Sequence, residues 1–254
     1  MHAIAVTGPG ASALAERLAA RCEDSVTVTR DDDAGAEPPG DFAVSLHPDG
    51  WTARGREHSV DDVLAELAPE HDYAFLVGVE ADLPTVAAGA DVEGAIASVD
   101  DPADADLEPV VTAIDATEPF ETLESLVARA KRAEGADRAG AIATFTGRVR
   151  RKDAADDSPT ELLEFETYEG VAAQRMAVIE SELEERDGVV EVLLHHRSGV
   201  IPAGEDIVFV VVLAGHRGEA FETVSDGIDR LKDEVPIFKK EVTAEEEFWV
   251  HDRP

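Results

Sequence analysis

The chain has 254 residues, 44% of them apolar, which excludes wholesale disorder and gives enough length for two modest domains. Its 56 acidic residues against 22 lysines and arginines give a formal charge of −34, which argues against nucleic acid as the main ligand. The one cysteine, Cys22, excludes a disulfide within the chain and a zinc site built from cysteines.

The acidic excess is spread along the chain, and lysine is scarce. Such a surface resembles that of proteins from salt-loving organisms, because high salt screens the repulsion between like charges. The N-terminus has no basic region before its first apolar run, and no apolar run is long enough to span a membrane. We therefore expect a cytoplasmic protein without a signal peptide and without a membrane partner.

The basic residues are unevenly distributed. Residues 1–117 contain five arginines and no lysine, whereas the other 17 of the 22 basic residues lie in residues 118–254. This shift predicts two domains with those bounds. The acidic, proline-containing segment 100–121 is the expected junction, although its "PVVTAI" could form a last strand of the first domain.

Strands and helices alternate in the first domain. The segments that predict them are, in order, the strand "HAIAVTG", the helix "ALAERLAARC", the helix "DDVLAELAPE" and the buried strand "DYAFLVGV". Alternation of this kind predicts an α/β layer with a parallel sheet.

A glycine turn, "TGPGAS", joins the first strand to the first helix. This arrangement has the shape of a phosphate-binding turn, because glycine permits close approach and a helix N-terminus attracts anions. The P-loop pattern G-x-x-x-x-G-K-[ST] also requires a lysine, and the first lysine of this chain is Lys131. A tight turn without a ligand and weak or vestigial nucleotide binding both remain open.

The second domain is predicted to be α+β. Its expected elements are the helix "ETLESLVARAKRA", the strands "AGAIATFTG" and "TELLEFETYEG", the helix "VAAQRMAVIESELEERDG", the strand "VVEVLLHHRSG", the turn "VIPAGED", the buried strand "IVFVVVLAG", the helix "GEAFETVSDGIDRLKDEV" and the antiparallel pair "IFKKEVT" and "EFWVH". His195 and His196 fall in a strand, where a hydrogen-bonded structural role is favoured over catalysis.

Cations gather on the last elements of this domain. His216 and Arg217 stand where a buried strand meets a helix, a position that favours anions. Lys232 ends that helix and Lys239 lies on the next strand, whereas Lys240 should point to the opposite face. A bound anion would relieve the repulsion within this set. The alternative is neutralisation by neighbouring carboxylates: Asp233, Glu234 and Glu241.

Several motifs in the second domain resemble one known family. They are "GAIATFTGRVR", "LEFETYEG", "HHRSGVIPAGEDIVFVVVLAGHRGEAF", "LKDEVPIFKKE" and "WVHDRP", and they occur in the order found in the large, catalytic subunit of molybdopterin synthase, the MoaE family. The resemblance covers residues 118–254. It implies an α/β-hammerhead fold, and a homodimer or a heterotetramer with a carrier protein.

The same resemblance implies an activity and its partners. A small ubiquitin-like (MoaD-like) carrier would deliver sulfur as a thiocarboxylate on its C-terminal Gly-Gly. Two transfers to cyclic pyranopterin monophosphate would form the dithiolene of molybdopterin, without a metal or a redox cofactor. By motif position, Lys232 and Lys239 are the implied catalytic residues. The implied substrate-binding residues are Phe145, Arg150, His216, Arg217 and Arg253.

The first domain resembles a different protein of the same pathway. The stretches "AVTGPG", "ALAERLA" and "GVEADLPTVAAG" are similar to the guanine-nucleotide-binding adaptor of molybdenum-cofactor synthesis, the MobB family. The resemblance implies a P-loop-like domain that is degenerate at its lysine, and it assigns no catalytic residue. The alternative to sulfur transfer is therefore a non-catalytic adaptor that binds a nucleotide or a pterin.

Overall fold

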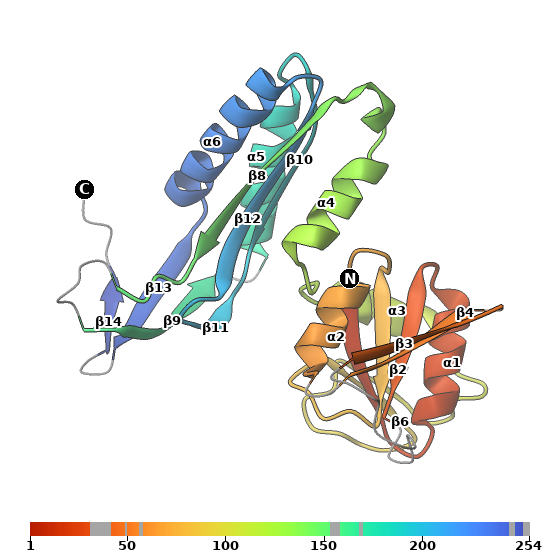
Figure 1. Cartoon of the computed structure of the whole chain (residues 1–254). Coiled ribbons are helices and arrows are strands. Elements are labelled where there is room, and N and C mark those ends of the chain that lie inside the picture. Colours follow the sequence, from red (N-terminus) through yellow and green to blue (C-terminus); the bar gives the residue numbers. More distant parts are fainter. Residues whose placement is uncertain are drawn as a thin grey trace. The chain divides into compact units, whose positions relative to one another are not determined.

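The computed structural model forms two compact units, Met1–Thr122 and Leu123–Pro254 (Figure 1). Two hydrogen bonds hold Phe120 in the first unit. The Met1 ammonium donates to the Phe120 carbonyl at 3.2 Å, and the Phe120 N–H donates to the Met1 carbonyl at 2.8 Å. No helix in the described part of the chain combines the length and apolar character needed to cross a membrane. The described residues are 1–30, 42–48, 50–55, 58–152, 158–167, 170–243 and 247–250.

The first unit is built on the predicted parallel sheet, whose strand order is β2-β5-β1-β6-β7. Its elements are β1 (His2–Thr7), α1 (Ala11–Arg21), β2 (Ser25–Thr29), the hairpin of β3 (Phe42–His47) and β4 (Gly50–Gly55), α2 (Val60–Leu67), β5 (Tyr73–Val77), β6 (Thr85–Ala88), β7 (Ala97–Val99) and α3 (Glu108–Asp115).

Apolar residues at helical spacing bring the helices onto this sheet. Leu14 and Leu18 of α1 are fully buried in one core, and Leu64 of α2 is fully buried in another. The segment "PVVTAI" is helical rather than a strand. Pro109 stands in the first turn of α3, where a missing N–H is harmless, and Val110 and Ile114 bury the same helix face at a spacing of four residues.

The second unit has two antiparallel sheets, with strand orders β10-β12-β8 and β11-β9-β13-β14. Its elements are α4 (Leu123–Arg132), the short helix η1 (Ala136–Arg138), β8 (Ala141–Arg148), β9 (Thr160–Thr167), α5 (Val171–Glu184), β10 (Val189–His196), β11 (Gly199–Pro202), β12 (Asp206–Ala214), α6 (Arg217–Glu234), β13 (Ile237–Thr243) and β14 (Glu247–Val250). The predicted pairing of the last two strands is confirmed.

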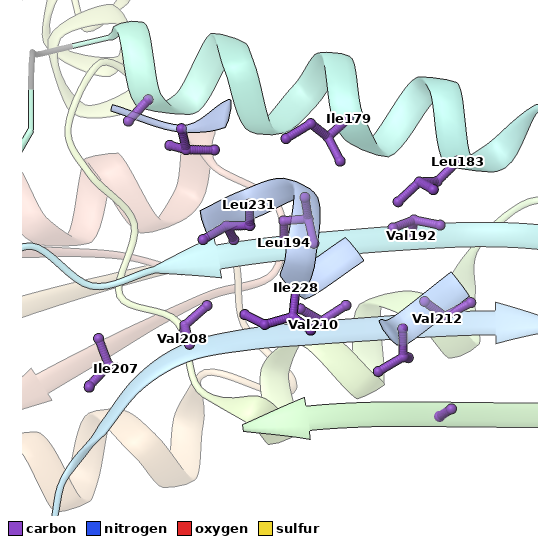
Figure 2. Close-up of a cluster of buried hydrophobic side chains, with 14 of the residues drawn as sticks. Ile179, Leu183, Val192, Leu194, Ile207, Val208, Val210, Val212, Ile228 and Leu231 are labelled. Atoms are coloured by element: carbon purple, nitrogen blue, oxygen red, sulfur yellow. The ribbon is translucent and has the colours of Figure 1, made fainter. Parts of the chain in front are cut away.

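Strand β12 is the centre of the second unit, because its side chains are buried on both faces of the sheet. Val210 and Val212 face α5 and α6, with Leu183 and Ile228 around them (Figure 2). Val211, on the opposite face, packs against α4. The sequence "VIPAGED" is not only a turn. Its first residues form β11, which pairs with β9 and buries Ile201 completely.

Candidate active site

Helix α6 carries Lys232, an implied catalytic residue, to the ring of Phe145, an implied substrate-binding residue. Lys232 is exposed in the last turn of α6, and its Nζ lies 6.0 Å from the centre of the Phe145 ring. Phe145 is half-buried on β8, against the main core. At this distance the ring face attracts the ammonium only weakly and does not neutralise its charge.

The strand β13 separates two adjacent lysines onto opposite faces, as predicted. Lys239 stands opposite Phe165 of β9 and shares its face of the sheet, which is the face turned to the core. Lys240 stands opposite Glu164, and its Nζ lies 3.6 Å from the Glu164 carboxylate. Both lysines are half-buried, but Lys240 is ion-paired with Glu164 while Lys239 lies on the opposite face, which also carries Phe165.

Arg150 is exposed just beyond the end of β8. Val149 anchors this position, because it is buried and its N–H donates to the Glu205 carbonyl at 2.8 Å, while its own carbonyl accepts from Gly204 at 2.9 Å. Phe145 and Arg150 thus lie toward the same end of β8 that the last turn of α6 reaches.

Gly147 sets the position of the Phe145 ring. A Cβ on Gly147 would lie 2.6 Å from Cγ1 of Val208 and 3.4 Å from Cε1 of Phe145. We expect Gly147→Ala to destabilise the second unit by about 1–3 kcal/mol and to displace the ring, since a packed core has no room for the methyl group. Thermal unfolding and activity would test this. Thr146→Ala at the neighbouring, half-buried position is the control and should change both much less.

His216 and Arg217 lie at the other end of α6. His216 is its N-cap, with extended backbone angles, and Arg217 is its first residue, and both are exposed. Lys232 follows Arg217 by 15 residues in the same helix. At a rise of about 1.5 Å per residue the two ends are about 22 Å apart. Within one chain, the connected elements therefore do not bring these residues to Lys232 and Lys239.

Neighbouring carboxylates do not neutralise these cations in the part of the chain that the structure describes. Glu234 forms ion pairs with Arg175 and Arg230, and Glu241 accepts from the Thr160 hydroxyl. These arginine contacts lower the pKa of the Glu234 carboxyl, with the Arg230 hydrogen bond as the main cause. No ion pair with a described side chain is recorded for Lys232, Lys239, His216 or Arg217.

Phe221 is a residue of this region that the sequence reasoning missed. It lies one turn after Arg217 and is 66% exposed. The signal was present in the helix pattern. The buried positions of α6 recur three and four residues apart, and Phe221 falls outside that stripe. The buried positions are Ala220, Thr223, Val224, Gly227, Ile228 and Leu231.

Two further predictions concern ligands and the C-terminus. Among the described residues, no three histidine, cysteine or carboxylate side chains gather as a metal ion would require. Arg253 lies outside the described residues, so its predicted place in the pocket stays a prediction.

The glycine turn of the first unit is filled by the protein itself. Gly8 has φ of +103°, and a Cβ there would lie 2.4 Å from the Ala88 carbonyl oxygen. The N–H of Gly10 donates to that carbonyl at 3.1 Å, and a Cβ on Gly10 would lie 2.3 Å from Pro102. Arg17 holds this covering segment, because its guanidinium donates to the carbonyls of Pro102 and Ala105. The Gly10 N–H and the space beside this glycine are therefore already taken by the protein's own residues.

Comparisons with known proteins agree with the motifs of the second unit. Residues 116–234 match the family model described as MoaE protein. The "Probable molybdopterin synthase" of Haloferax volcanii is 53% identical over 261 aligned residues, covering 100% of both chains. The "Molybdopterin synthase catalytic subunit" of Pyrococcus abyssi is 40% identical over 111 residues, 44% of this chain and 74% of that protein.

Among solved structures, a molybdopterin synthase from Staphylococcus aureus covers 53% of this chain and 93% of its own, with 29% identity and a TM-score of 0.46. The likeness to the Haloferax volcanii protein extends over the first unit as well as the second. The chain therefore belongs to the molybdopterin synthase family of MoaE proteins.

Proposed function

We propose that this chain is the catalytic subunit of a molybdopterin synthase. It transfers sulfur from the thiocarboxylated C-terminus of a small carrier protein to cyclic pyranopterin monophosphate and so forms the dithiolene of molybdopterin. The observation that carries the proposal is the pairing of Lys232 with the Phe145 ring, in a chain where carboxylates outnumber cations and yet none neutralises this ammonium among the described residues.

The chemistry of sulfur transfer suits these side chains. A thiocarboxylate is an anion, and Lys232 and Lys239 supply cations that can hold it. Negative charge that develops on sulfur and oxygen is stabilised by a preorganised ammonium, because the cation needs no reorientation as the reaction proceeds. A lysine can also accept or donate the protons that addition and elimination require.

The phosphate of the substrate suits the first turn of α6. Arg217 and His216 stand there beside backbone N–H groups that point along the helix axis. Because about 22 Å separates the two ends of α6, a single pocket that holds phosphate and thiocarboxylate together needs a second copy of the chain. We therefore propose a homodimer in which each copy supplies one end of α6 to each site. Arg253 is proposed as a further phosphate ligand.

Reconstitution is the direct test. The chain would be mixed with thiocarboxylated carrier and the cyclic pterin at high salt, as the acidic surface suggests, and molybdopterin would be measured after oxidation to a fluorescent derivative. We expect one carrier to be consumed for each sulfur transferred. Absence of product with a carrier shown to be thiocarboxylated would overturn the proposal.

The finer fold assignments belong to the same proposal. Two antiparallel sheets in the second unit suit an α/β-hammerhead. In the first unit, β1 is central and the glycine turn follows its carboxyl end, where the strand order changes direction, as ligand sites do in open parallel sheets. This placement favours descent of the first unit from a MobB-like adaptor. A cytoplasmic location suits both that adaptor and the proposed sulfur transfer.

The alternative function, a nucleotide-binding adaptor, is opposed by the filled turn. We predict that calorimetric titration of the full chain with GTP and Mg²⁺ gives no binding up to millimolar nucleotide, because the Gly10 N–H and the space beside it are already occupied. Binding that is lost on substitution of Gly10 would instead support the adaptor. Ala20→Ser, at an exposed position near the end of α1, serves as the control.

A further inference from the structure

Helix α6 is joined to α5 by a row of ion pairs along one flank. Three charged residues of α6 stand four positions apart and therefore share that flank. Their partners follow one another along α5 and its C-terminal end in the reverse order, so the two helices run antiparallel. In the order of α6, the pairs are Asp226 with Arg186 at 2.7 Å, Arg230 with Glu182, and Glu234 with Arg175.

Glu234 is the most firmly held member of this row, because both of its carboxylate oxygens accept hydrogen bonds. Oε1 accepts from Nε of Arg230 at 2.7 Å, and Oε2 accepts from Nη2 of Arg230 at 3.2 Å and from Nη2 of Arg175. The same Nη2 of Arg230 also donates to Glu182. A carboxylate that is held by two nitrogens of a planar guanidinium has a fixed direction as well as a fixed distance. These contacts therefore hold the last turn of α6 in one orientation against α5.

The apolar face of α6 constrains that orientation less. Gly227 lies where α6 approaches the sheet closely, since a Cβ there would lie 3.1 Å from Val210 and 3.7 Å from Leu183. Contacts between apolar surfaces are non-directional, whereas a bidentate ion pair accepts one geometry. The row of ion pairs thus supplies the directional part of the packing of α6.

Lys232 lies between two members of the row in the sequence but on another side of the helix. Each residue turns an α-helix by about 100°, so Lys232 points about 160° away from both Arg230 and Glu234. The row faces α5, while the Lys232 ammonium lies over the Phe145 ring of β8. Arg230 and Glu234 therefore hold the turn that carries Lys232, and they pair with each other and with α5 rather than with its ammonium.

The same turn also leads directly into the strand that carries the second lysine. β13 begins three residues after Glu234, and Lys239 is its third residue. Val235, in the connection, is buried and its N–H donates to the Leu231 carbonyl at 3.1 Å. The Ile237 N–H donates in turn to the Val235 carbonyl at 2.9 Å. A displacement of the last turn of α6 would therefore move both lysines.

We propose that Glu234, held by Arg230 and Arg175, is a positioning residue for sulfur transfer, because it fixes the last turn of α6 and so places Lys232 for the reaction. The inference rests on the proposed function of Lys232 and deepens it. The two arginines also occupy the carboxylate that stands only two residues from Lys232. In a chain with 56 acidic residues, this leaves the ammonium available for an anion.

Glu234→Gln tests the proposal, because it removes the charge of the ion pair and keeps the size of the side chain. We expect kcat for sulfur transfer to fall about 10- to 100-fold, since a small misplacement of a reacting group has effects of this size. Asp226→Asn is the matched control, because it removes a charge from the same row about 12 Å earlier along α6. It should leave kcat within about two-fold.

A spectroscopic reading reports the position of Lys232 whether or not the protein transfers sulfur. The chain has only five lysines, so carbon-13 labelling of lysine gives five side-chain ε-signals. The Phe145 ring lies 6.0 Å from the Lys232 ammonium, and its ring current shifts the signal of the ε-protons. Lys232→Arg identifies this signal, and Phe145→Leu shows where it falls without the ring. In Glu234→Gln the signal should move most of the way to that value, and in Asp226→Asn it should stay.

Wild-type kcat or an unmoved Lys232 signal in Glu234→Gln would overturn the proposal. An equal loss of kcat in Asp226→Asn would also overturn it, because a general loosening of α6 would then explain both variants. If Glu234→Gln does not fold, Arg175→Gln removes one donor and leaves the Arg230 contact, and it should give smaller changes in the same direction. No change there would overturn the proposal. If the wild type transfers no sulfur, the proposed function fails, while the Lys232 signal still decides whether Glu234 sets its position.

Discussion

Replacement of Lys232 by alanine is expected to lower kcat for sulfur transfer about 100- to 1,000-fold, which is the usual effect of removing one preorganised charge from a reacting centre. The side chain is exposed and ends above the Phe145 ring, with no ion pair to a described residue. Its removal should therefore change the free energy of unfolding by less than about 0.5 kcal/mol. Lys232→Arg would keep the charge and should recover only part of the rate, because a planar guanidinium holds its charge differently and does not release a proton.

The matched control is Lys240→Ala, on the neighbouring strand. Lys240 pairs with Glu164 on the face of β13 opposite to Lys239, so its loss should leave kcat within about two-fold, because its ammonium points away from the candidate site. Single-turnover rates and thermal melting of wild type and the three variants would be compared. Equal rates in wild type and Lys232→Ala would remove the catalytic role of Lys232, whatever the rate of Lys240→Ala.

The sheets were predictable where apolar residues form long runs. In "IVFVVVLAG" every side chain is apolar or glycine, and the structure buries this strand on both faces between α4 and the pair α5 and α6. In "IFKKEVT" the alternation of a strand predicted that Lys239 and Lys240 face opposite ways, and the ion pair of Lys240 with Glu164 confirms it. Both predictions follow from the two-residue period of a strand.

Short apolar runs misled the prediction, because their length does not distinguish strand from helix. "PVVTAI" contains β-branched residues typical of strands, but Val110 and Ile114 meet the core at helical spacing. "VIPAGED" contains turn residues, yet Val200 and Ile201 pair with β9 before the turn begins. In both segments the partner element, which lies far away in the sequence, decides the outcome.

The candidate site also has features that the sequence predicts and features that it does not. The sequence identified the cations and predicted which element carries each, and the length of α6 alone implies that Arg217 and Lys232 stand about 22 Å apart. The contact of Lys232 with Phe145 could not be predicted from the spacing of apolar residues, since it depends on the position of α6 along β8. Gly227 sets that position in part, because a Cβ there would lie only 3.1 Å from Val210.

The second large effect concerns pH. His196 is predicted to make the second unit less stable as the pH falls from about 6.5 to about 4. The side chain is half-buried, its ring meets Phe165 edge-on at 4.8 Å, and its Nδ1 lies 2.8 Å from the Arg197 carbonyl. Burial lowers the pKa of His196 from 6.5 to about 4, although the hydrogen bond to Arg197 opposes part of this shift. The folded protein therefore keeps the ring neutral where the unfolded chain takes up a proton.

The sign of the effect follows from proton uptake. Between about pH 6.5 and pH 4 the unfolded state binds more protons than the folded state, so the free energy of unfolding decreases as the pH decreases. Below about pH 4 both states are protonated and the loss is complete. A difference of that size in pKa corresponds to about 3 kcal/mol.

The measurement must separate His196 from the 56 acidic residues, whose protonation relieves repulsion and acts in the opposite direction. Unfolding of wild type and His196→Gln would therefore be followed from pH 7.5 to pH 4.5 at constant high salt, and only the difference between the two curves interpreted. Glutamine keeps a donor for the Arg197 carbonyl but has no charge to gain. The difference should shift by up to about 3 kcal/mol in favour of the variant at the acidic end. Parallel curves would show that His196 is not held neutral by burial, and water or a counter-charge would then have to reach its ring beside Phe165.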